Sequence, residues 1–283
     1  MELIHKIEGV RTLLDARRAQ GQIIGLVPTM GALHAGHQSL IRAAADATDV
    51  VMTTIFVNPL QFSPDEDLDA YPRNLDRDCT LAEQSGADVV FAPSVAEMYP
   101  TPILTTVSPG GPLSTTLEAQ TRPSHFDGVA TVVAKLLNIA GRCQAFFGEK
   151  DYQQLQIVTR MVSDLDMPVD IVGCPTVREP DGLALSSRNG YLSPAERAAA
   201  PVLHRALSAG VQAITDGERD AATVRGIMED LIAEEPLGSL DYAAVVNART
   251  LEVPDPLAGE LRLLTAVRFG STRLLDNMAA SVR

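Results

Sequence analysis

The stretch IIGLVPTMGALHAGHQSLI, residues 23–41, changes from a strand-like to a helix-like pattern through a short loop. Its first part, Ile23–Val27, is a brief apolar run, and apolar residues recur at helical spacing from Leu40 onward. The loop between them contains Gly31 and Gly36, which allow the backbone to approach a ligand closely. It leads into a helix N-terminus, where free N–H groups and the helix dipole favour an anion. The stretch therefore predicts a strand, a phosphate-binding loop and a helix.

Two histidines in this loop, His34 and His37, are three residues apart. On a first helical turn they would lie on one face, where both could donate to the same polyphosphate. Spacing alone leaves a simpler reading open, since a loop of glycine and histidine after a strand is usually only a tight turn. The fuller string is more specific: it resembles the HxGH signature of the nucleotidyltransferase superfamily, and PTMGALHAGHQSL resembles the pantoate-beta-alanine ligases (pantothenate synthetases). The resemblance implies that His34 and His37 are catalytic and that ATP contacts Met30, Gly31, Ala32, Leu33, His34, Ala35, Gly36 and His37.

The composition indicates a folded protein without a membrane segment. A chain of 283 residues, 46% of them hydrophobic, can form one large or two ordinary domains and is not disordered. No apolar run approaches the length of about 18 residues that spans a bilayer, and the N-terminal twenty residues form an amphipathic helix pattern without a signal core. We therefore expect a soluble cytoplasmic protein.

The charged residues and cysteines exclude several classes of function. A net charge of -13 repels polyanions and argues against nucleic-acid binding, so an anionic substrate needs a local positive pocket. Cys79, Cys143 and Cys174 are odd in number and far apart, which supports neither a disulfide framework nor a zinc site. We expect them to be reduced and partly buried.

Short apolar runs alternate with helical stretches along the first 175 residues, a pattern typical of a parallel, Rossmann-like doubly wound α/β sheet. We expect a nucleotide- and pantoate-binding domain over residues 1–175 and a smaller C-terminal α/β lid domain over 176–283. The strands predicted after Ile23–Val27 are Asp49–Val57, Ala87–Pro93, Ile103–Val107, Gln144–Phe147 and Val169–Val172. In the smaller domain, Pro194–Ala213 and Ala221–Glu234 are predicted helices, and Tyr242–Val246 and Leu261–Val267 are predicted strands.

Asn58 and Gln61 follow a predicted strand directly, where the carboxyl ends of parallel strands bind ligands. Their amides could donate to a carboxylate or hydroxyl without adding charge, although such residues also simply form turns. The string FVNPxQF resembles the family, which implies that Gln61 contacts pantoate and β-alanine and that Asn58 belongs to the same substrate site.

A second polar segment, Arg122–Gly128, leads into an apolar helix. Arg122 and His125 could supply positive charge, and Gly128 would admit close packing. The segment resembles the family pattern RPxHFxGVxTVVxKL, which implies a substrate-binding role for Arg122 and His125.

In the string FGEKDYQQL, Gly148 gives backbone freedom, Lys150 is a compact cation suited to phosphate, and Asp151 is placed to cap a helix. The resemblance implies that Gly148, Glu149, Lys150 and Asp151 border ATP, with Lys150 catalytic, and that Gln154 holds pantoate.

The charged segment Ser63–Arg77 reads as a loop before a helix that extends to about Gly86. Asp76 and Asp78 could face a magnesium ion bound to nucleotide, but a solvated helix start is the favoured interpretation.

The string LALSSRNGY offers the hydroxyls of Ser186 and Ser187 and the guanidinium of Arg188 to a polyphosphate, as in a mobile lid. On chemistry alone a serine-rich segment is usually just a loop. The resemblance implies that this is the family's counterpart of the KMSKS loop, with ATP contacts from Val177, Leu185, Ser186, Ser187 and Arg188. Leu185 stands where the family commonly has methionine, an apolar exchange of similar volume.

The resemblance implies an ATP-dependent ligase that joins pantoate to β-alanine through pantoyl adenylate and releases AMP and diphosphate. It also implies Mg²⁺, whose protein ligands are unknown, and a homodimer. One alternative is another adenylyl- or cytidylyltransferase or a small class I aminoacyl-tRNA synthetase, although the net charge disfavours RNA. The other is a catalytically silent nucleotide-binding regulator, against which the intact motifs count; a turnover assay would decide.

Overall fold

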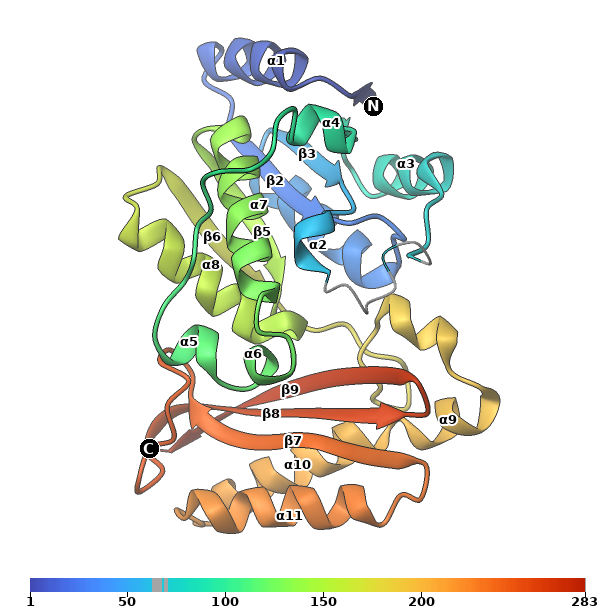
Figure 1. The fold of residues 1–283 in the computed structure, drawn as a ribbon, viewed down its shortest axis with the longest axis vertical. Coiled ribbons are helices and arrows are strands. Elements are labelled where there is room, and N and C mark those ends of the chain that lie inside the picture. Colours follow the sequence, from blue (N-terminus) through green and yellow to red (C-terminus); the bar gives the residue numbers. More distant parts are fainter. Residues whose placement is uncertain (63–67, 69–70, 283) are drawn as a thin grey trace. The chain divides into compact units, whose positions relative to one another are not determined.

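The computed structural model describes residues 1–62, 68 and 71–282, and the chain divides into two compact units (Figure 1). The first unit comprises Met1–Glu149 and Gln154–Pro175, and the second comprises Lys150–Gln153 and Thr176–Arg283. The four residues Lys150–Gln153 therefore pack with the C-terminal part of the chain, although in sequence they interrupt the first unit.

The first unit contains a six-stranded parallel sheet in the order β1-β4-β3-β2-β5-β6. Its strands are β1 Glu2–Ile4, β2 Ile24–Thr29, β3 Val50–Ile55, β4 Val89–Phe91, β5 Cys143–Gly148 and β6 Val169–Cys174. From β2 the chain adds β3 and β4 on one side and then returns to add β5 on the other. The carboxyl ends of β2 and β5 thus form a topological switch point, where open α/β sheets bind ligands. The predicted doubly wound sheet is confirmed.

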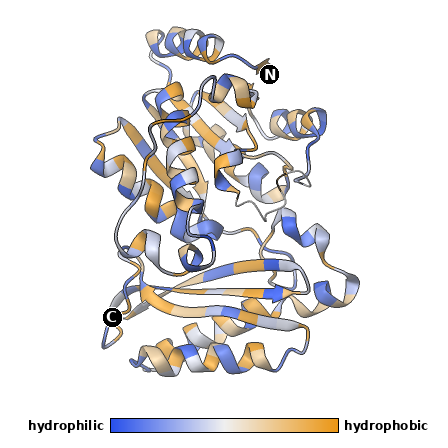
Figure 2. Ribbon diagram, in the orientation of Figure 1, coloured by the Kyte–Doolittle hydropathy of each residue, from blue (hydrophilic) through white to orange (hydrophobic). Residues whose placement is uncertain are grey.

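Helices lie in the chain between these strands. The longer ones are α1 Ile7–Ala19, α2 Ala35–Ala47, α3 Leu75–Gln84, α7 His125–Ala140 and α8 Tyr152–Asp164, and the short ones are α4 Val95–Met98, α5 Pro112–Thr115, α6 Glu118–Thr121 and the 3-10 turns η1 Pro59–Gln61 and η2 Glu149–Asp151. The apolar side of α2, with Leu40 and Ile41, packs on Val27 and Phe146 of the sheet. Helix α7 is buried along most of its length, and Figure 2 shows hydrophobic residues concentrated along it and the central strands.

Two predictions about the secondary structure of the first unit are wrong. The N-terminal twenty residues are not one helix, because Glu2–Ile4 pair with β4 at the sheet edge before α1 begins. Residues 103–107, all of them described, form no strand. The Val107 N–H donates to Thr131 Oγ1 on α7 at 3.0 Å, and Leu104 is 96% exposed. This segment lies between Pro102 and Pro109, and its backbone pairs with a side chain instead of a neighbouring strand.

The second unit is a three-stranded antiparallel sheet with helices on one face. Its strands are β7 Gly238–Asn247, β8 Gly259–Phe269 and β9 Thr272–Val282, and its helical segments are η3 Ser187–Tyr191, α9 Pro194–Ala199, α10 Val202–Thr215 and α11 Ala221–Ala233. Leu203 and Leu207 of α10, Met228 of α11, and Leu263 and Phe269 of β8 form its core. The predicted C-terminal α/β unit is thus present.

The details of this unit differ from the prediction in two places. The helix predicted over Pro194–Ala213 breaks before Pro201, whose ring removes a helical donor. Strand β9 was not predicted, because Asp276 and Asn277 at its centre are residue types depleted in strands. Both side chains are buried and hydrogen-bonded, so tertiary contacts override their low strand propensity.

The three cysteines are free, as expected; Cys143 and Cys174 are buried and Cys79 is half-buried. Burial raises the pKa of Cys143 to about 12. None of the helices in the described part of the chain combines the length and apolar character needed to cross a bilayer.

Candidate active site

The loop after β2 takes a tight path that depends on a buried carboxylate. Gly31 and Ala32 have positive φ angles of 85° and 50°. The N–H groups of Ala32 and Leu33 both donate to Asp78 of α3, each at 2.8 Å, and Asp78 is buried. An added Cβ on Gly31 would lie 3.0 Å from the same carboxylate. Glycine therefore meets both the backbone and the packing requirement at this position.

Asp78 is buried, so the prediction that it belongs to a solvated helix start is wrong. Asp76 is exposed, as that prediction expects. Both oxygens of Asp78 accept N–H groups of the loop, so this carboxylate is already engaged within the protein. Among the described residues there is no group of three or more His, Cys, Asp or Glu side chains that could hold a metal ion. Part of the predicted loop Ser63–Arg77, namely residues 63–67, 69 and 70, lies outside the described residues.

His34 and His37 lie together at the start of α2, with ring centroids 4.1 Å apart. His34 is the N-cap, and its Nδ1 accepts the Gly36 N–H at 3.1 Å. The Nδ1 of His37 accepts the N–H of His34 at 3.4 Å. Because each Nδ1 is an acceptor, the neutral form of each ring carries its proton on Nε2. The helix cap thereby fixes two imidazoles as Nε2–H donors.

The two amides beyond β3 form a buried unit. Asn58 is 0% exposed, and its Nδ2 donates to Gln61 Oε1 at 3.0 Å and to the Gly128 carbonyl at 3.1 Å. Its Oδ1 accepts from the Leu60 N–H and from the Tyr99 hydroxyl. Both donors and both acceptor positions of Asn58 are thus filled by the protein, and this side chain orients Gln61.

Arg122 and His125 contact the same turn. Both donate to the main-chain carbonyl of Gln61, Arg122 Nη2 at 3.2 Å and His125 Nδ1 at 3.0 Å. Arg122 Nη1 also lies 3.0 Å from His125 Nε2. A carbonyl only accepts and a guanidinium only donates, so His125 is neutral with its proton on Nδ1. The prediction that His125 supplies positive charge is therefore wrong for this arrangement, in which Arg122 and His125 hold Gln61.

Close packing of α7 on η1 requires a glycine, as predicted for Gly128. An added Cβ at this position would lie 2.1 Å from the Leu60 carbonyl oxygen and 2.9 Å from the Gln61 N–H nitrogen. Gly128 thus allows α7 to reach the turn that carries the two amides.

The first unit also contains Gly148, Glu149 and Gln154. The φ of Gly148 is not positive, and an added Cβ there meets open space, so neither the backbone nor the packing of the protein requires a glycine. The predicted need for backbone freedom at Gly148 is not observed. Gln154 is half-buried on the first turn of α8, and Glu149 lies near Cys174, where it adds to the effect of burial in raising the pKa of that thiol.

The second unit carries Lys150 and the predicted lid residues. Lys150 Nζ lies 3.3 Å from Asp151 Oδ1, so Asp151 pairs with this lysine. Residues 177–185 form a hairpin in which the Leu185 N–H donates to the Val177 carbonyl. Ser186 caps η3 by accepting the Arg188 N–H at 3.2 Å. The serines thus begin a short 3-10 turn after a hairpin.

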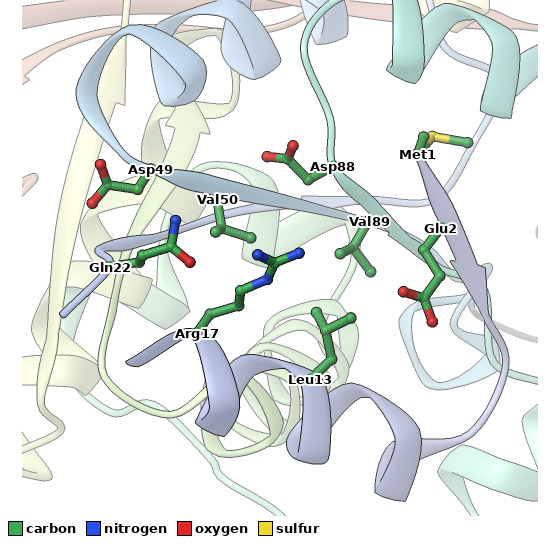
Figure 3. Close-up of a pocket in the computed structure, with 9 residues that line it drawn as sticks. All are labelled: Met1, Glu2, Leu13, Arg17, Gln22, Asp49, Val50, Asp88 and Val89. Carbon is green, nitrogen blue, oxygen red and sulfur yellow. The ribbon is translucent and has the colours of Figure 1, made fainter. Parts of the chain in front are cut away.

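A cavity of about 460 Å³ elsewhere in the first unit is unrelated to these residues (Figure 3). It lies at the amino ends of β3 and β4, beside Val50 and Val89, the edge of the sheet opposite to the switch point. The carboxylates of Asp49 and Asp88 there accept the N–H groups of Ile23 and Val51, so they support the sheet.

A family model for pantoate-beta-alanine ligase matches residues 2–279 of the chain. The chain belongs to the pantoate-beta-alanine ligase family. Among curated proteins, the pantothenate synthetase of Moorella thermoacetica is 52% identical over 282 residues, which cover 100% of this chain and 99% of that protein. The solved pantothenate synthetase from Thermus thermophilus is 45% identical with a TM-score of 0.93, covering 98% of this chain and 99% of that one.

A further solved family member, the pantoate-beta-alanine ligase from Francisella tularensis, is complexed with beta-gamma ATP and beta-alanine. It is 33% identical with a TM-score of 0.81, and the match covers 98% of this chain and 97% of that one. The resemblance, the fold class and the ligase function predicted from the motifs are confirmed. The sequence motifs did not reveal the role of Asp78, which depends on contacts with residues 46 and 45 positions away.

Replacing Asp78 by asparagine should destabilise the protein by about 1–3 kcal/mol, because an amide nitrogen would face one of the two loop N–H groups. Urea unfolding without Mg²⁺ measures this free energy. Asp76→Asn, on the exposed side of the same helix, is the control and should change it by less than about 0.5 kcal/mol. An unchanged midpoint for Asp78→Asn would contradict the structural role.

Gly128→Ala should destabilise the first unit by about 1–3 kcal/mol, because the new methyl group collides with a main-chain carbonyl of η1. Gly226→Ala is a matched control within helix α11, where an added Cβ meets open space. That variant should gain about 0.5–1 kcal/mol from helix propensity. Thermal and urea unfolding compare the two, and equal stability of both variants would refute the close contact.

Proposed function

We propose that this chain condenses pantoate with β-alanine at the expense of ATP, through pantoyl adenylate, with the two imidazole Nε2–H donors at the switch point acting on the phosphates of ATP. The observation that carries this proposal is the reciprocal cap of α2, which aligns His34 and His37 as donors. It stands at the carboxyl end of β2, beside β5, in a chain of the pantoate-beta-alanine ligase family.

In the first step, a carboxylate oxygen of pantoate attacks the α-phosphorus of ATP. A bond forms between oxygen and phosphorus, the bond from the α-phosphorus to its bridging oxygen breaks, and diphosphate leaves. His34, His37 and Lys150 stabilise the negative charge that develops on phosphate oxygens, and the cap of α2 holds the two histidines in place, which avoids their reorganisation during the step. In the second step, the β-alanine amine attacks the acyl carbon, AMP leaves with the electron pair of the broken bond, and the amine loses a proton.

The pantoate site is assigned to Gln61 and Gln154. Gln61 is held at its side chain by Asn58 and at its carbonyl by Arg122 and His125. Asn58, Arg122 and His125 therefore act in our proposal by holding Gln61 in place, which refines the direct substrate contact predicted from the sequence. Because a mispositioned donor leaves a buried substrate hydroxyl or carboxylate unpaired, this support affects pantoate affinity.

The remaining assignments follow the family resemblance. ATP contacts residues 30–37, Gly148, Glu149, Lys150, Asp151, Val177, Leu185, Ser186, Ser187 and Arg188, with the first unit as the nucleotide- and pantoate-binding domain and the second as the lid. Open space beside Gly148 is consistent with a ligand approaching its backbone. Mg²⁺ enters as part of the substrate MgATP, since this ion is commonly bound through phosphates with few protein carboxylates. The protein acts as a homodimer in the cytoplasm, where ATP and reduced thiols occur together.

The proposed adenylate route is tested by isotope exchange. Labelled diphosphate should appear in ATP when the protein is incubated with MgATP and pantoate but without β-alanine, because the first half-reaction then runs reversibly. Omitting pantoate is the control and should abolish exchange. ADP as the nucleotide product, or exchange without pantoate, would overturn the adenylate mechanism.

The two roles of His34 can be separated by one substitution. His34→Asn keeps a strong N-cap acceptor for the Gly36 N–H but removes the Nε2–H donor. Its unfolding free energy should stay within about 0.5 kcal/mol of the parent, whereas kcat should fall by about 10²–10³. Urea unfolding and steady-state kinetics provide the two measurements. Near-normal turnover in the folded variant would show that His34 is only a cap.

A further inference from the structure

Strand β9 of the second unit carries two consecutive buried polar residues, Asp276 and Asn277, each 2% exposed. Successive residues of a strand point to opposite faces of its sheet. Burial of such side chains is unfavourable unless they are hydrogen-bonded, so their partners explain why they are present. Within the second unit, each of these side chains binds a segment that carries a proposed ATP-binding residue.

Asn277 links the sheet to the backbone of Lys150. Its Nδ2 donates to the Lys150 carbonyl oxygen at 2.8 Å, and its Oδ1 accepts from Arg262 Nε at 2.6 Å. A carbonyl only accepts and a guanidinium only donates, so these two partners fix the orientation of the amide. Aspartate in this position could still accept from Arg262 but could not donate to Lys150.

Arg262 provides a second contact to the same turn, through Tyr152. Its guanidinium carbon lies 4.0 Å from the centroid of the Tyr152 ring, and the Tyr152 hydroxyl donates to the Ala248 carbonyl at 2.9 Å. Arg262 is itself 7% exposed, so this cation and ring contact forms away from most of the water. The turn from Lys150 to Tyr152 is thus held at its first carbonyl, at an aromatic ring and at a hydroxyl.

Asp276 binds the hairpin before the proposed lid serines. Its carboxylate accepts both Arg178 Nη1 at 2.6 Å and Nη2 at 2.9 Å. Arg178 also donates to the carbonyls of Gly182 and Asn277. A two-point ion pair of this kind fixes direction as well as distance. Neighbouring residues of one strand therefore hold the Lys150 turn and the base of the hairpin.

We propose that Asn277 and Arg262 are positioning residues for Lys150, which makes the C-terminal sheet part of the adenylation machinery. This inference rests on the proposed function, in which Lys150 acts on the phosphates of ATP. A lysine on an unsupported turn would sample many positions, and displacement of a charged group by about 1 Å can reduce a rate about 10²-fold. Neither residue touches substrate in this proposal; both act through the backbone that carries Lys150.

The first test compares variants of the network in the complete protein. Asn277→Ala and Arg262→Ala should each lower the rate of pantoate-dependent diphosphate exchange about 10-fold or more, with little change in the KM for β-alanine. Asn277→Asp should be equally slow, because it keeps the Arg262 contact and loses the Lys150 contact. If Asn277 had only a structural role, the Asn277→Asp variant would exchange diphosphate at the parental rate.

A matched control is available on the same sheet. Arg273 of β9 also pairs with a carboxylate, Asp241 at 2.6 Å, and lies over a tyrosine ring, Tyr242 at 5.9 Å. Both of these partners lie on β7, and neither belongs to the Lys150 turn. Arg273→Ala should therefore keep the parental exchange rate, and an equal loss in Arg273→Ala and Arg262→Ala would overturn the proposal.

A double-mutant cycle shows whether Asn277 acts through Lys150. In the Lys150→Ala background, adding Asn277→Ala should cause no further loss of exchange rate, although it should lower the melting temperature as much as in the parent. If the rate loss of the double variant equalled the product of the losses of the two single variants, the positioning role would be overturned. If Lys150→Ala alone exchanges at the parental rate, the proposed function of Lys150 fails, an outcome distinct from failure of the network.

Discussion

The two hydrogen bonds from the loop N–H groups of Ala32 and Leu33 to the Asp78 carboxylate are the constraint on which the rest of the site depends. Ala32 has a positive φ, which costs a residue with a Cβ on the order of 1 kcal/mol. Hydrogen bonds to a buried carboxylate are stronger than neutral ones and offset this cost. With the loop held in this way, Leu33 enters the core and His34 begins α2.

Histidine is an unusual N-cap, since serine, threonine, asparagine and aspartate are preferred. The choice is understandable if each ring has two functions at once. The Nδ1 of each ring satisfies a backbone donor of the helix start, and that same bond places the remaining proton on Nε2. A serine would cap the helix equally well, but it has no second group that could act, as the imidazole Nε2–H does, as a donor away from the helix. In the proposed function, helix stability and catalysis therefore use opposite edges of the same imidazole.

The sequence was sufficient to predict the parts of the fold that depend on local pattern. Apolar runs identified β2, β3, β4, β5 and β6, and the loop string identified the family. Contacts between distant residues were not accessible in this way. Nothing local distinguishes the buried Asp78 from the exposed Asp76, because only the packing of α3 against the loop separates them. His125 was similarly assigned a charge that its partners, a guanidinium and a carbonyl, exclude.

The position of Lys150 shows a further limit of reading residues in order. In sequence it follows β5 directly, and the parallel sheet alone would assign it to the first unit. Yet Lys150–Gln153 pack with the C-terminal unit, because that unit supplies a donor to the Lys150 carbonyl and places the Arg262 guanidinium over the Tyr152 ring. Of the two buried polar residues that hide β9 from a pattern search, Asn277 binds this segment, and Asp276 binds Arg178 of the hairpin. Both residues are therefore present in the strand because of the segments that they bind, and the second unit cannot be removed without removing the partners of the Lys150 turn.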